Sequence, residues 1–334
     1  MKERVLSGVQ PTNALHIGNY LGAIRNWVKL QDQAECLFCI VDLHALTNAP
    51  SPQDLRANIY AVAAAYVACG INPDTNYIFN QSQVSGHAEL AWIFNCVTPL
   101  GWLNRMTQFK DKAGKHKEQA VLGLYAYPVL QAADILLYKA AKVPVGEDQR
   151  QHIELARDIA GAFNRKYETE YFPMPDLENL GVPMRIMSLR DGTKKMSKSD
   201  ESDYSRIHLD DDADLIALKI RKAKTDALPI PEDFSELAQR PEAENLVSLY
   251  AYFSDVKEQD VCNQFAGANF SVFKTALTEA VVTHMAPIRA TYIDLMKDKT
   301  HLDQILIRGR DYAASISQQT IKDVYDIVGL LRNA

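Results

Sequence analysis

A strand, a turn and a helix start follow one another within Ser7-Gly8-Val9-Gln10-Pro11-Thr12-Asn13-Ala14-Leu15-His16-Ile17-Gly18-Asn19-Tyr20. Branched apolar residues up to Val9 predict the strand, and apolar residues at helical spacing from Ile17 predict the helix. Gly18 falls in the first helical turn, where unpaired backbone N–H groups attract an anion, and His16 adds a donor. This stretch alone fits an ordinary strand-to-helix turn as well as a nucleotide site, so a second motif is needed.

The second motif is Lys194-Lys195-Met196-Ser197-Lys198-Ser199-Asp200, which follows a strand-like segment and a turn at Gly192. Together the two stretches resemble the motif pair of class I aminoacyl-tRNA synthetases, which is approximately His-Ile-Gly-His and Lys-Met-Ser-Lys-Ser. The second motif is complete here. The first departs at its last position, where Asn19 replaces a histidine but keeps a hydrogen-bonding side chain.

Length and composition bound the class of protein. The chain has 334 residues, of which 47% are hydrophobic and 23% charged, as expected for a globular protein of two domains. No apolar run is long enough to predict a membrane span, and we expect a cytoplasmic location. The net charge of −6 argues against non-specific coating of nucleic acid, so any RNA site must be local.

The five cysteines are expected to be reduced and structural. Cys36 and Cys39 have a C-x-x-C spacing, but they fall in a predicted strand, where residues three apart point to opposite faces and cannot converge on one metal. Cys69, Cys96 and Cys262 are isolated among apolar residues, which predicts packing in the core. No metal site held by the protein is predicted.

Strands and helices alternate in the first part of the chain. Strands at 36–41 and 76–80 flank a helix at 51–69, and with the first unit they predict a doubly wound, Rossmann-like parallel sheet. Ligands bind such sheets at the carboxyl ends of the strands. Four polar residues lie just past those ends and should converge there: Gln10, Asp42, His44 and Gln81.

Residues 82–126 interrupt this alternation with helical, partly basic sequence, which predicts an insertion between the sheet halves. Its lysines fit a solvated helix face, with Lys112 the one expected to reach polyphosphate. A helix opened by Pro128 follows, apolar except for Gln131 and Asp134. A buried carboxylate needs a partner, so Asp134 is either paired within the protein or available to a donor on a ligand.

A short strand at 142–145 leads into Gly146-Glu147-Asp148-Gln149, where the next helix begins. Acidic residues in a first turn also suit the helix dipole, which is the alternative explanation for Glu147 and Asp148. Their position after a strand favours a further role, because acidic side chains there commonly hold ribose hydroxyls in nucleotide-binding sheets.

Several runs together resemble bacterial-type tryptophanyl-tRNA synthetases across nearly the whole catalytic half. They are Ser-Gly-x-Gln-Pro-Thr, Ile-Gly-Asn-Tyr-x-Gly-Ala, Ile-Val-Asp-x-His-Ala, Tyr-Pro-x-Leu-x-Ala-Ala-Asp-Ile-Leu and Val-Gly-Glu-Asp-Gln-x-Gln-His. The resemblance accounts for Asn19, since that subfamily carries asparagine there. Two departures remain: Asn13 replaces a frequent glycine, and Gln131 stands where many relatives have methionine.

The resemblance implies a two-step ligase that activates tryptophan with ATP and Mg²⁺ and then charges tRNA(Trp). It also implies a homodimer, as relatives are. The residues implied for ATP are Gln10, Pro11, Thr12, His16, Gly18, Asn19, Gly146, Glu147, Asp148, Ile186, Lys195, Met196, Ser197, Lys198 and Ser199. Those implied for catalysis are Lys195, Lys198 and Lys112. Those implied for tryptophan are Leu6, His44, Tyr127, Gln131, Asp134, Val143 and Gln149. Asp134 is expected to accept the indole N–H, because that nitrogen is only a donor.

Beyond Asp200 the pattern turns helical, with runs predicted at about 243–253, 256–265, 271–296 and 317–331. We therefore predict a Rossmann-like catalytic domain over 1–205 and an all-α domain over 206–334, which the resemblance implies would bind the tRNA anticodon stem-loop. Three alternatives stay open on the sequence: a tyrosyl-tRNA synthetase, a small-molecule adenylyltransferase, and an RNA-binding paralogue without activity.

Overall fold

The structure is a computed structural model, which describes residues 2–12, 14–106, 120–144, 146, 149–177, 185–198 and 200–331. Its sheet has five parallel strands in the order β3-β2-β1-β4-β5. The strands are β1 (Arg4–Val9), β2 (Glu35–Ile40), β3 (Tyr77–Asn80), β4 (Lys142–Val143) and β5 (Asp176–Leu177). The chain adds strands on both sides of β1, which confirms the predicted doubly wound sheet and adds β5, a strand that was not predicted.

The helix after β1 begins where it was predicted. It consists of α1 (Ile17–Asn19), a π-helical turn (Tyr20–Ile24) and α2 (Arg25–Leu30). The short α3 (Asp42–Ala45) follows β2, and α4 (Pro52–Ala68) covers the sheet. The Ser51 side chain accepts the Asp54 N–H at the start of α4, and Gly70 at φ +106° ends it, as the serine, proline and glycine predict.

The two faces of the sheet bury separate apolar clusters. On one face Phe38 packs with Trp27 and Tyr66, and on the other Phe79 packs with Tyr138. Cys36 belongs to the first cluster and Cys39 to the second, so the two thiols point apart as expected for a strand. Cys69 and Cys262 are buried, but Cys96 is exposed at the end of α5 (Gly86–Asn95), so its predicted core position is wrong.

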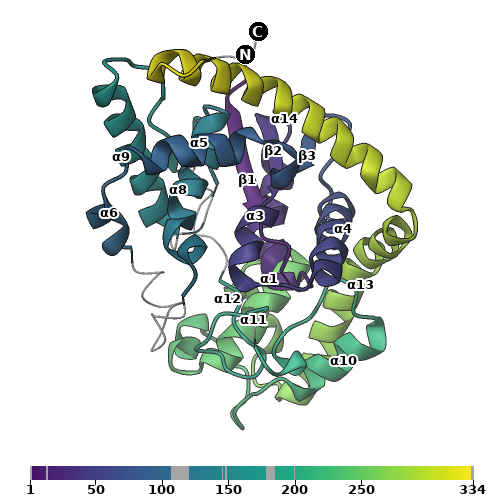
Figure 1. Cartoon of the computed structure of the whole chain (residues 1–334). Helices are drawn as coiled ribbons and strands as arrows, with labels where there is room; N and C mark the ends of the chain where they lie inside the picture. Colours follow the sequence, from purple (N-terminus) through teal and green to yellow (C-terminus); the bar gives the residue numbers. More distant parts are fainter. Residues whose placement is uncertain are drawn as a thin grey trace.

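Four helices gather beside the second face of the sheet (Figure 1). They are α5 (Gly86–Asn95), α6 (Leu100–Asn104), α8 (Leu122–Leu137) and α9 (Arg150–Lys166). Pro128 lies inside α8 rather than opening it, because the helix begins one and a half turns earlier at Leu122. The apolar part of α8, which carries Asp134, lies against the second face of the sheet.

The helices after Asp200 begin in the lower part of Figure 1, on the side toward which the strands point, and the last of them runs back across the top. They are α10 (Ala213–Lys222), α11 (Pro241–Ser254), α12 (Glu258–Phe265), α13 (Phe270–Lys297) and α14 (Lys299–Val328). The first apolar cluster continues from the sheet into these helices. The prediction that the last helix starts near 317 is wrong: Asp298 accepts the His301 N–H, and the helix runs on from Lys299.

Helix α14 returns from the helical half and crosses the outermost strand, β3 (Figure 1). A Cβ at Gly309 would overlap the backbone of Ile78, so glycine is required for this approach. The Tyr77 and Tyr312 rings stack at 3.6 Å, and an Arg308 Nη1 lies 3.1 Å from Asp74 Oδ1. The helical half is thus attached to the sheet at both ends. Within the described residues, no helix is long and apolar enough to cross a membrane.

Candidate active site

The two sequence motifs lie side by side at the carboxyl end of β1. The segment after the second motif pairs antiparallel with the start of the first, since Ile17 N–H donates to Ile207 O at 2.9 Å and Leu209 N–H to Leu15 O at 3.0 Å. The second motif itself is one arm of a hairpin, in which Met196 N–H donates to Ile186 O at 2.9 Å. The structure therefore joins stretches that are almost 200 residues apart in the sequence.

His16 and Asn19 form a reciprocal cap at the start of α1. The Gly18 N–H donates to His16 Nδ1 at 3.1 Å, and the His16 N–H donates to Asn19 Oδ1 at 3.2 Å. Burial, reinforced by the nearby Lys198 ammonium, lowers the pKa of His16 to about 3. The imidazole is therefore neutral, and because Nδ1 accepts, its proton is on Nε2, which can act as a donor.

Lys198 lies at the carboxyl end of β1, next to Gln10. Its Nζ donates to the Gln10 carbonyl at 3.4 Å, and burial lowers the pKa of Lys198 to about 8. Met196 is buried, and a Cβ on Gly18 would lie 3.6 Å from the Met196 Cβ, so the motifs touch there. Lys195 is exposed, whereas Ser197 is partly buried.

The remaining residues predicted for ATP are placed as follows. Thr12 N–H donates to Gln10 O at 2.9 Å, which forms a tight turn through the buried Pro11. Ile186 is buried in the hairpin, and Gly146 accepts the Gln149 N–H at 2.9 Å ahead of α9. Four predicted site residues, Lys112, Glu147, Asp148 and Ser199, and the departure at Asn13, lie outside the described residues.

Asp134 is the centre of a buried polar network beneath the ends of β2 and β3. Its Oδ2 lies 2.7 Å from His44 Nε2, and its Oδ1 lies 2.6 Å from both Gln81 Nε2 and His87 Nδ1. Burial opposes ionisation, but the contacts with His44 and His87 hold the pKa of Asp134 well below its usual range. The carboxylate is therefore charged, as a strong acceptor must be.

Polar residues past the strand ends converge partly as predicted. Gln81 also accepts the Leu43 N–H at 3.1 Å, which ties the end of β3 to the end of β2. Asp42 turns away from Asp134 and accepts the Ser82 N–H at 2.9 Å instead. Gln10 lies next to Lys198 and not within the network around Asp134.

The other residues predicted for tryptophan lie on β1, on β4, on α8 and at the start of α9. The Tyr127 ring meets the His44 ring edge-on at 6.1 Å, and its hydroxyl lies 3.0 Å from His152 Nε2. Gln131 Nε2 donates to Gln149 Oε1 at 3.3 Å, which joins α8 to the start of α9. Leu6 on β1 and Val143 on β4 are buried in the second apolar cluster.

His87 is a member of the network that the sequence did not predict. It is fully buried on α5, and its Nε2 lies 2.7 Å from the Tyr138 hydroxyl. Its only signal in the sequence is a histidine in the first turn of an otherwise apolar helix, which is more often a packed core residue. The contact with Asp134, 47 positions away, appears only in the fold.

Comparisons with known proteins agree with this geometry. The model for tRNA synthetases class I (W and Y) matches residues 2–286. The chain is 51% identical to the tryptophan–tRNA ligase of Brucella melitensis biotype 1, covering 99% of both chains. It is 53% identical to that of Rickettsia felis, covering 99% of this chain and 100% of the relative.

A solved structure of the Campylobacter jejuni tryptophanyl-tRNA synthetase, complexed with ADP and tryptophan, superposes with a TM-score of 0.83. It is 33% identical and covers 98% of this chain and 100% of its own. The match along the whole chain, added to the two adjoining motifs, settles the family. This chain belongs to the bacterial-type tryptophan–tRNA ligases, within the class I aminoacyl-tRNA synthetases.

Proposed function

We propose that this enzyme activates L-tryptophan with ATP and transfers it to tRNA(Trp) in two steps at the carboxyl edge of the sheet. The carboxylate of tryptophan attacks the α-phosphate, which forms tryptophanyl-adenylate and releases pyrophosphate. The terminal ribose of the tRNA then takes the acyl group and releases AMP. The observation that carries the proposal is the backbone pairing of Leu15 and Ile17 with the segment that follows Lys198, since it builds one site from both nucleotide motifs.

In this proposal the first motif cradles the nucleotide through Gln10, Pro11, Thr12, His16, Gly18 and Asn19. The neutral His16 donates from Nε2, and Gly18 leaves room for close approach. Ile186, Gly146, Glu147 and Asp148 hold the adenosine. Met196, Ser197 and Ser199 shape the loop around the phosphates.

Lys195 and Lys198 neutralise the charge that builds on the pyrophosphate, with Lys112 as a further phosphate contact. Activation at a phosphoryl centre depends mainly on positioning and on stabilising this charge. The residues described include no group of three acidic, histidine or cysteine side chains suited to hold a metal. We propose that a Mg²⁺ ion is bound mainly through the ATP phosphates, where it would add positive charge.

The indole N–H is proposed to bind Asp134. A carboxylate has about four acceptor sites, and three are taken by His44, Gln81 and His87, so one remains on Oδ2. Leu6 and Val143 supply apolar walls, while His44 and Tyr127 meet at right angles beside the ring. Gln131 and Gln149 line the α8–α9 side. Phenylalanine cannot donate and would leave the acceptor unpaired, which a buried site rejects strongly.

The helical half is proposed to bind the anticodon stem-loop of the tRNA. Helices α10 to α13 lie beyond the strand ends, on the same side of the sheet as both motifs (Figure 1). We divide the chain at about 205 for function, with the catalytic residues before that point. Helix α14 nevertheless packs on β3, so the two parts share one core.

We also propose that the enzyme is a homodimer that works in the cytoplasm. Large apolar side chains are exposed on adjoining elements α5, α6 and the start of α8, namely Trp92 (70%), Leu100 (69%), Val121 (57%) and Leu122 (79%). Tyr125 Oη donates to Leu100 O at 3.1 Å, which holds two of these elements together. Such a patch on a soluble enzyme favours burial against a second copy. The five cysteines are free thiols, which fits a reducing compartment.

Amino-acid-dependent ATP–pyrophosphate exchange with each of the twenty amino acids tests this function. Exchange should occur with tryptophan and be far weaker with tyrosine and phenylalanine, and tRNA(Trp) should accept labelled tryptophan. Exchange with tyrosine as the preferred substrate would contradict the proposed pocket. Exchange without tRNA charging would confine the proposal to the first step.

A further inference from the structure

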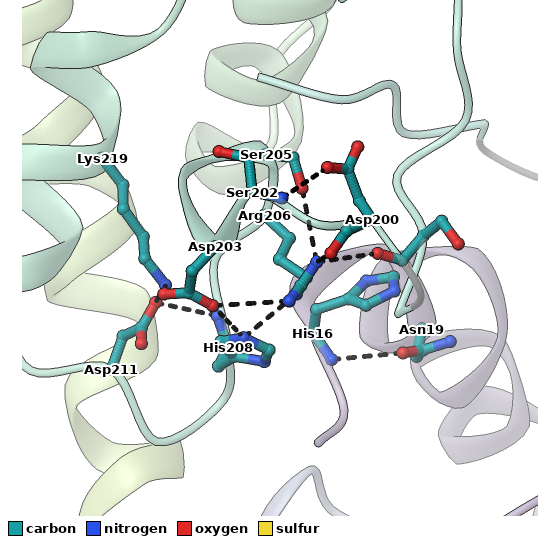
Figure 2. Close-up of polar contacts among 11 residues, drawn as sticks. His16, Asn19, Asp200, Ser202, Asp203, Ser205, Arg206, His208, Asp211 and Lys219 are labelled. Atoms are coloured by element: carbon teal, nitrogen blue, oxygen red, sulfur yellow. Dashed lines mark hydrogen bonds and ion pairs between the residues drawn. The ribbon is translucent and has the colours of Figure 1, made fainter. Parts of the chain in front are cut away.

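Arg206 follows the second nucleotide motif, on the segment that pairs with the start of the first motif. The neighbouring residues Ile207 and Leu209 make the backbone bonds to Ile17 and Leu15. These backbone bonds fix the position of residue 206 relative to the start of α1. Figure 2 shows the Arg206 guanidinium between the Asp203–His208 pair and the main chain at Asp200.

The guanidinium bonds main-chain carbonyls of the second motif. Arg206 Nη1 donates to Asp200 O at 2.9 Å and to Ser197 O at 3.3 Å. Its side chain is only 11% exposed, so these bonds are largely shielded from water. Nη1 thus holds two carbonyls of the Lys195–Asp200 segment while Nη2 faces Asp203, a set of contacts that a lysine, with its single nitrogen, could match only in part.

Two side chains, Asp203 and His208, lie against the other nitrogens of the guanidinium. Asp203 Oδ1 lies 3.6 Å from Arg206 Nη2 and 2.8 Å from His208 Nε2. His208 Nε2 also lies 3.2 Å from Arg206 Nε, but one nitrogen cannot accept from Arg206 and donate to Asp203 at once. The contact with the Asp203 carboxylate is the shorter one, so we assign the proton to His208 Nε2. The N–H group of His208 and the charged guanidinium of Arg206 then both face Asp203.

Lys219 anchors this group to the helical half. It is fully buried on α10, and its Nζ lies 2.9 Å from Asp203 Oδ2 and 2.7 Å from Asp211 Oδ2. Asp211 Oδ2 also accepts the His208 N–H at 2.9 Å. A buried ammonium without partners is strongly destabilising. The folded protein therefore keeps both carboxylates beside Lys219. Figure 2 shows Lys219 reaching them from the α10 ribbon.

We infer that Arg206 is a positioning residue for ATP, which holds the main chain of the Lys195–Asp200 motif against the start of α1 through its bonds to Ser197 and Asp200. Asp203, His208 and Lys219 support it from the side of α10. The inference rests on the proposed function of the motif. Because none of these residues bonds the network around Asp134, losing Arg206 should weaken ATP use and spare the tryptophan site.

Arg206→Met tests this, with Arg240→Met as the matched control. Arg240 also donates to two carbonyls, those of Leu228 and Pro229, and pairs with both oxygens of Asp226, and its side chain is 14% exposed. These bonds of Arg240 do not reach the motif. Both variants should therefore lose a similar amount of thermal stability. Only Arg206→Met should lower kcat/KM for ATP, by about tenfold or more, the worth of one or two charge-assisted bonds.

The expected pattern is a higher KM for ATP and a lower exchange kcat in Arg206→Met, with the KM for tryptophan within about twofold of wild type. ATP affinity measured by calorimetry should fall in parallel. Arg206→Lys should recover part of the loss, and it serves as the folded variant if the methionine form does not fold. The inference is overturned if Arg206→Met, or Arg206→Lys in its place, matches Arg240→Met in ATP kinetics and ATP affinity, or if the KM values for ATP and tryptophan change equally.

Wild-type exchange with tryptophan tests the proposed function separately. If the wild type shows no exchange, the proposed function fails, while the calorimetric comparison of ATP affinity still decides the role of Arg206.

Discussion

His44 and Asp134 meet at 2.7 Å between Nε2 and Oδ2, although 90 positions separate them in the sequence. The pair connects the end of β2 with the last turn of α8, and both side chains are almost fully buried. Because Nε2 donates to the carboxylate, the His44 proton is on that nitrogen. The ring is therefore held in a fixed orientation beside Tyr127, and the carboxylate keeps its charge.

Replacing Asp134 should change the choice of amino acid more than the use of ATP. We expect Asp134→Ala to raise the KM for tryptophan sharply and to narrow its advantage over phenylalanine, which is on the order of 10⁴ or more in sites of this kind. Asp134→Asn keeps an oxygen acceptor without the charge and should fall between. Exchange kinetics with both amino acids measure this. Retained selectivity with lost thermal stability would show that the carboxylate is structural.

Lys198→Ala should reduce the exchange kcat on the order of a hundredfold, because it removes one preorganised charge at the developing pyrophosphate. The KM for tryptophan should change little. Rapid-quench measurement of adenylate formation gives the rate of the step itself. A rate within about threefold of wild type would contradict a role for this ammonium in the transition state.

The same lysine predicts a pH dependence. The pKa of Lys198 is lowered to about 8, so its charge is present below pH 8 and is lost as the pH rises through that value. Wild-type kcat/KM for ATP, which reports the free enzyme, should therefore fall above pH 8. In Lys198→Arg the guanidinium stays charged, and this decline should disappear or move to higher pH. Identical profiles for both proteins would assign the decline to another group.

Gly309→Ala should destabilise the protein by about 1–3 kcal/mol, because the added methyl overlaps the β3 backbone at Ile78. Gly101→Ala is the matched control, since Gly101 also lies in a helix but has open space around it. Alanine is the better helix former, so the control should be neutral or slightly more stable. Urea unfolding measures both. Equal stability of the two variants would mean that α14 can move away from the strand at no cost.

Trp92→Glu should shift a dimer toward monomer, because it places a charge within the exposed apolar patch of α5, α6 and α8. Leu228→Glu is a comparable change at a side chain that is 59% exposed in the helical half. Sedimentation velocity over a range of protein concentrations distinguishes them. If Leu228→Glu dissociates the dimer and Trp92→Glu does not, the interface lies elsewhere.

The sequence predicted the sheet and the positions of α1 and α4, because each depends on a local pattern. The link between the two motifs came only from the family resemblance, since they are far apart in the chain. Asn19 could be assigned by its motif, and its side chain completes the cap with His16. Arg206 could not be predicted, because its bonds to Ser197 and Asp200 depend on how the chain turns after the motif. His87 depends in the same way on the crossing of α5 and α8.

The start of helix α14 could not be predicted from local sequence patterns. Its first half is rich in charged residues, and only a few buried positions, such as Leu302 and Leu306, mark its inner face. A helix of 30 residues was therefore predicted at about half its length. Its start depends on the Asp298 cap and its path on Gly309, neither of which forms an apolar repeat.

The docking of α14 on β3 also constrains the order of events at the ribosome. Asp74 and Arg308 are 234 positions apart, and at ordinary elongation rates the second is made roughly ten to fifty seconds after the first. During that time the outer strand has no helix to cover it, and an open strand edge can pair with other nascent chains. The catalytic half is thus synthesised early but finished late, so chaperone binding to its β3 edge would be most useful before residues 299–328 emerge.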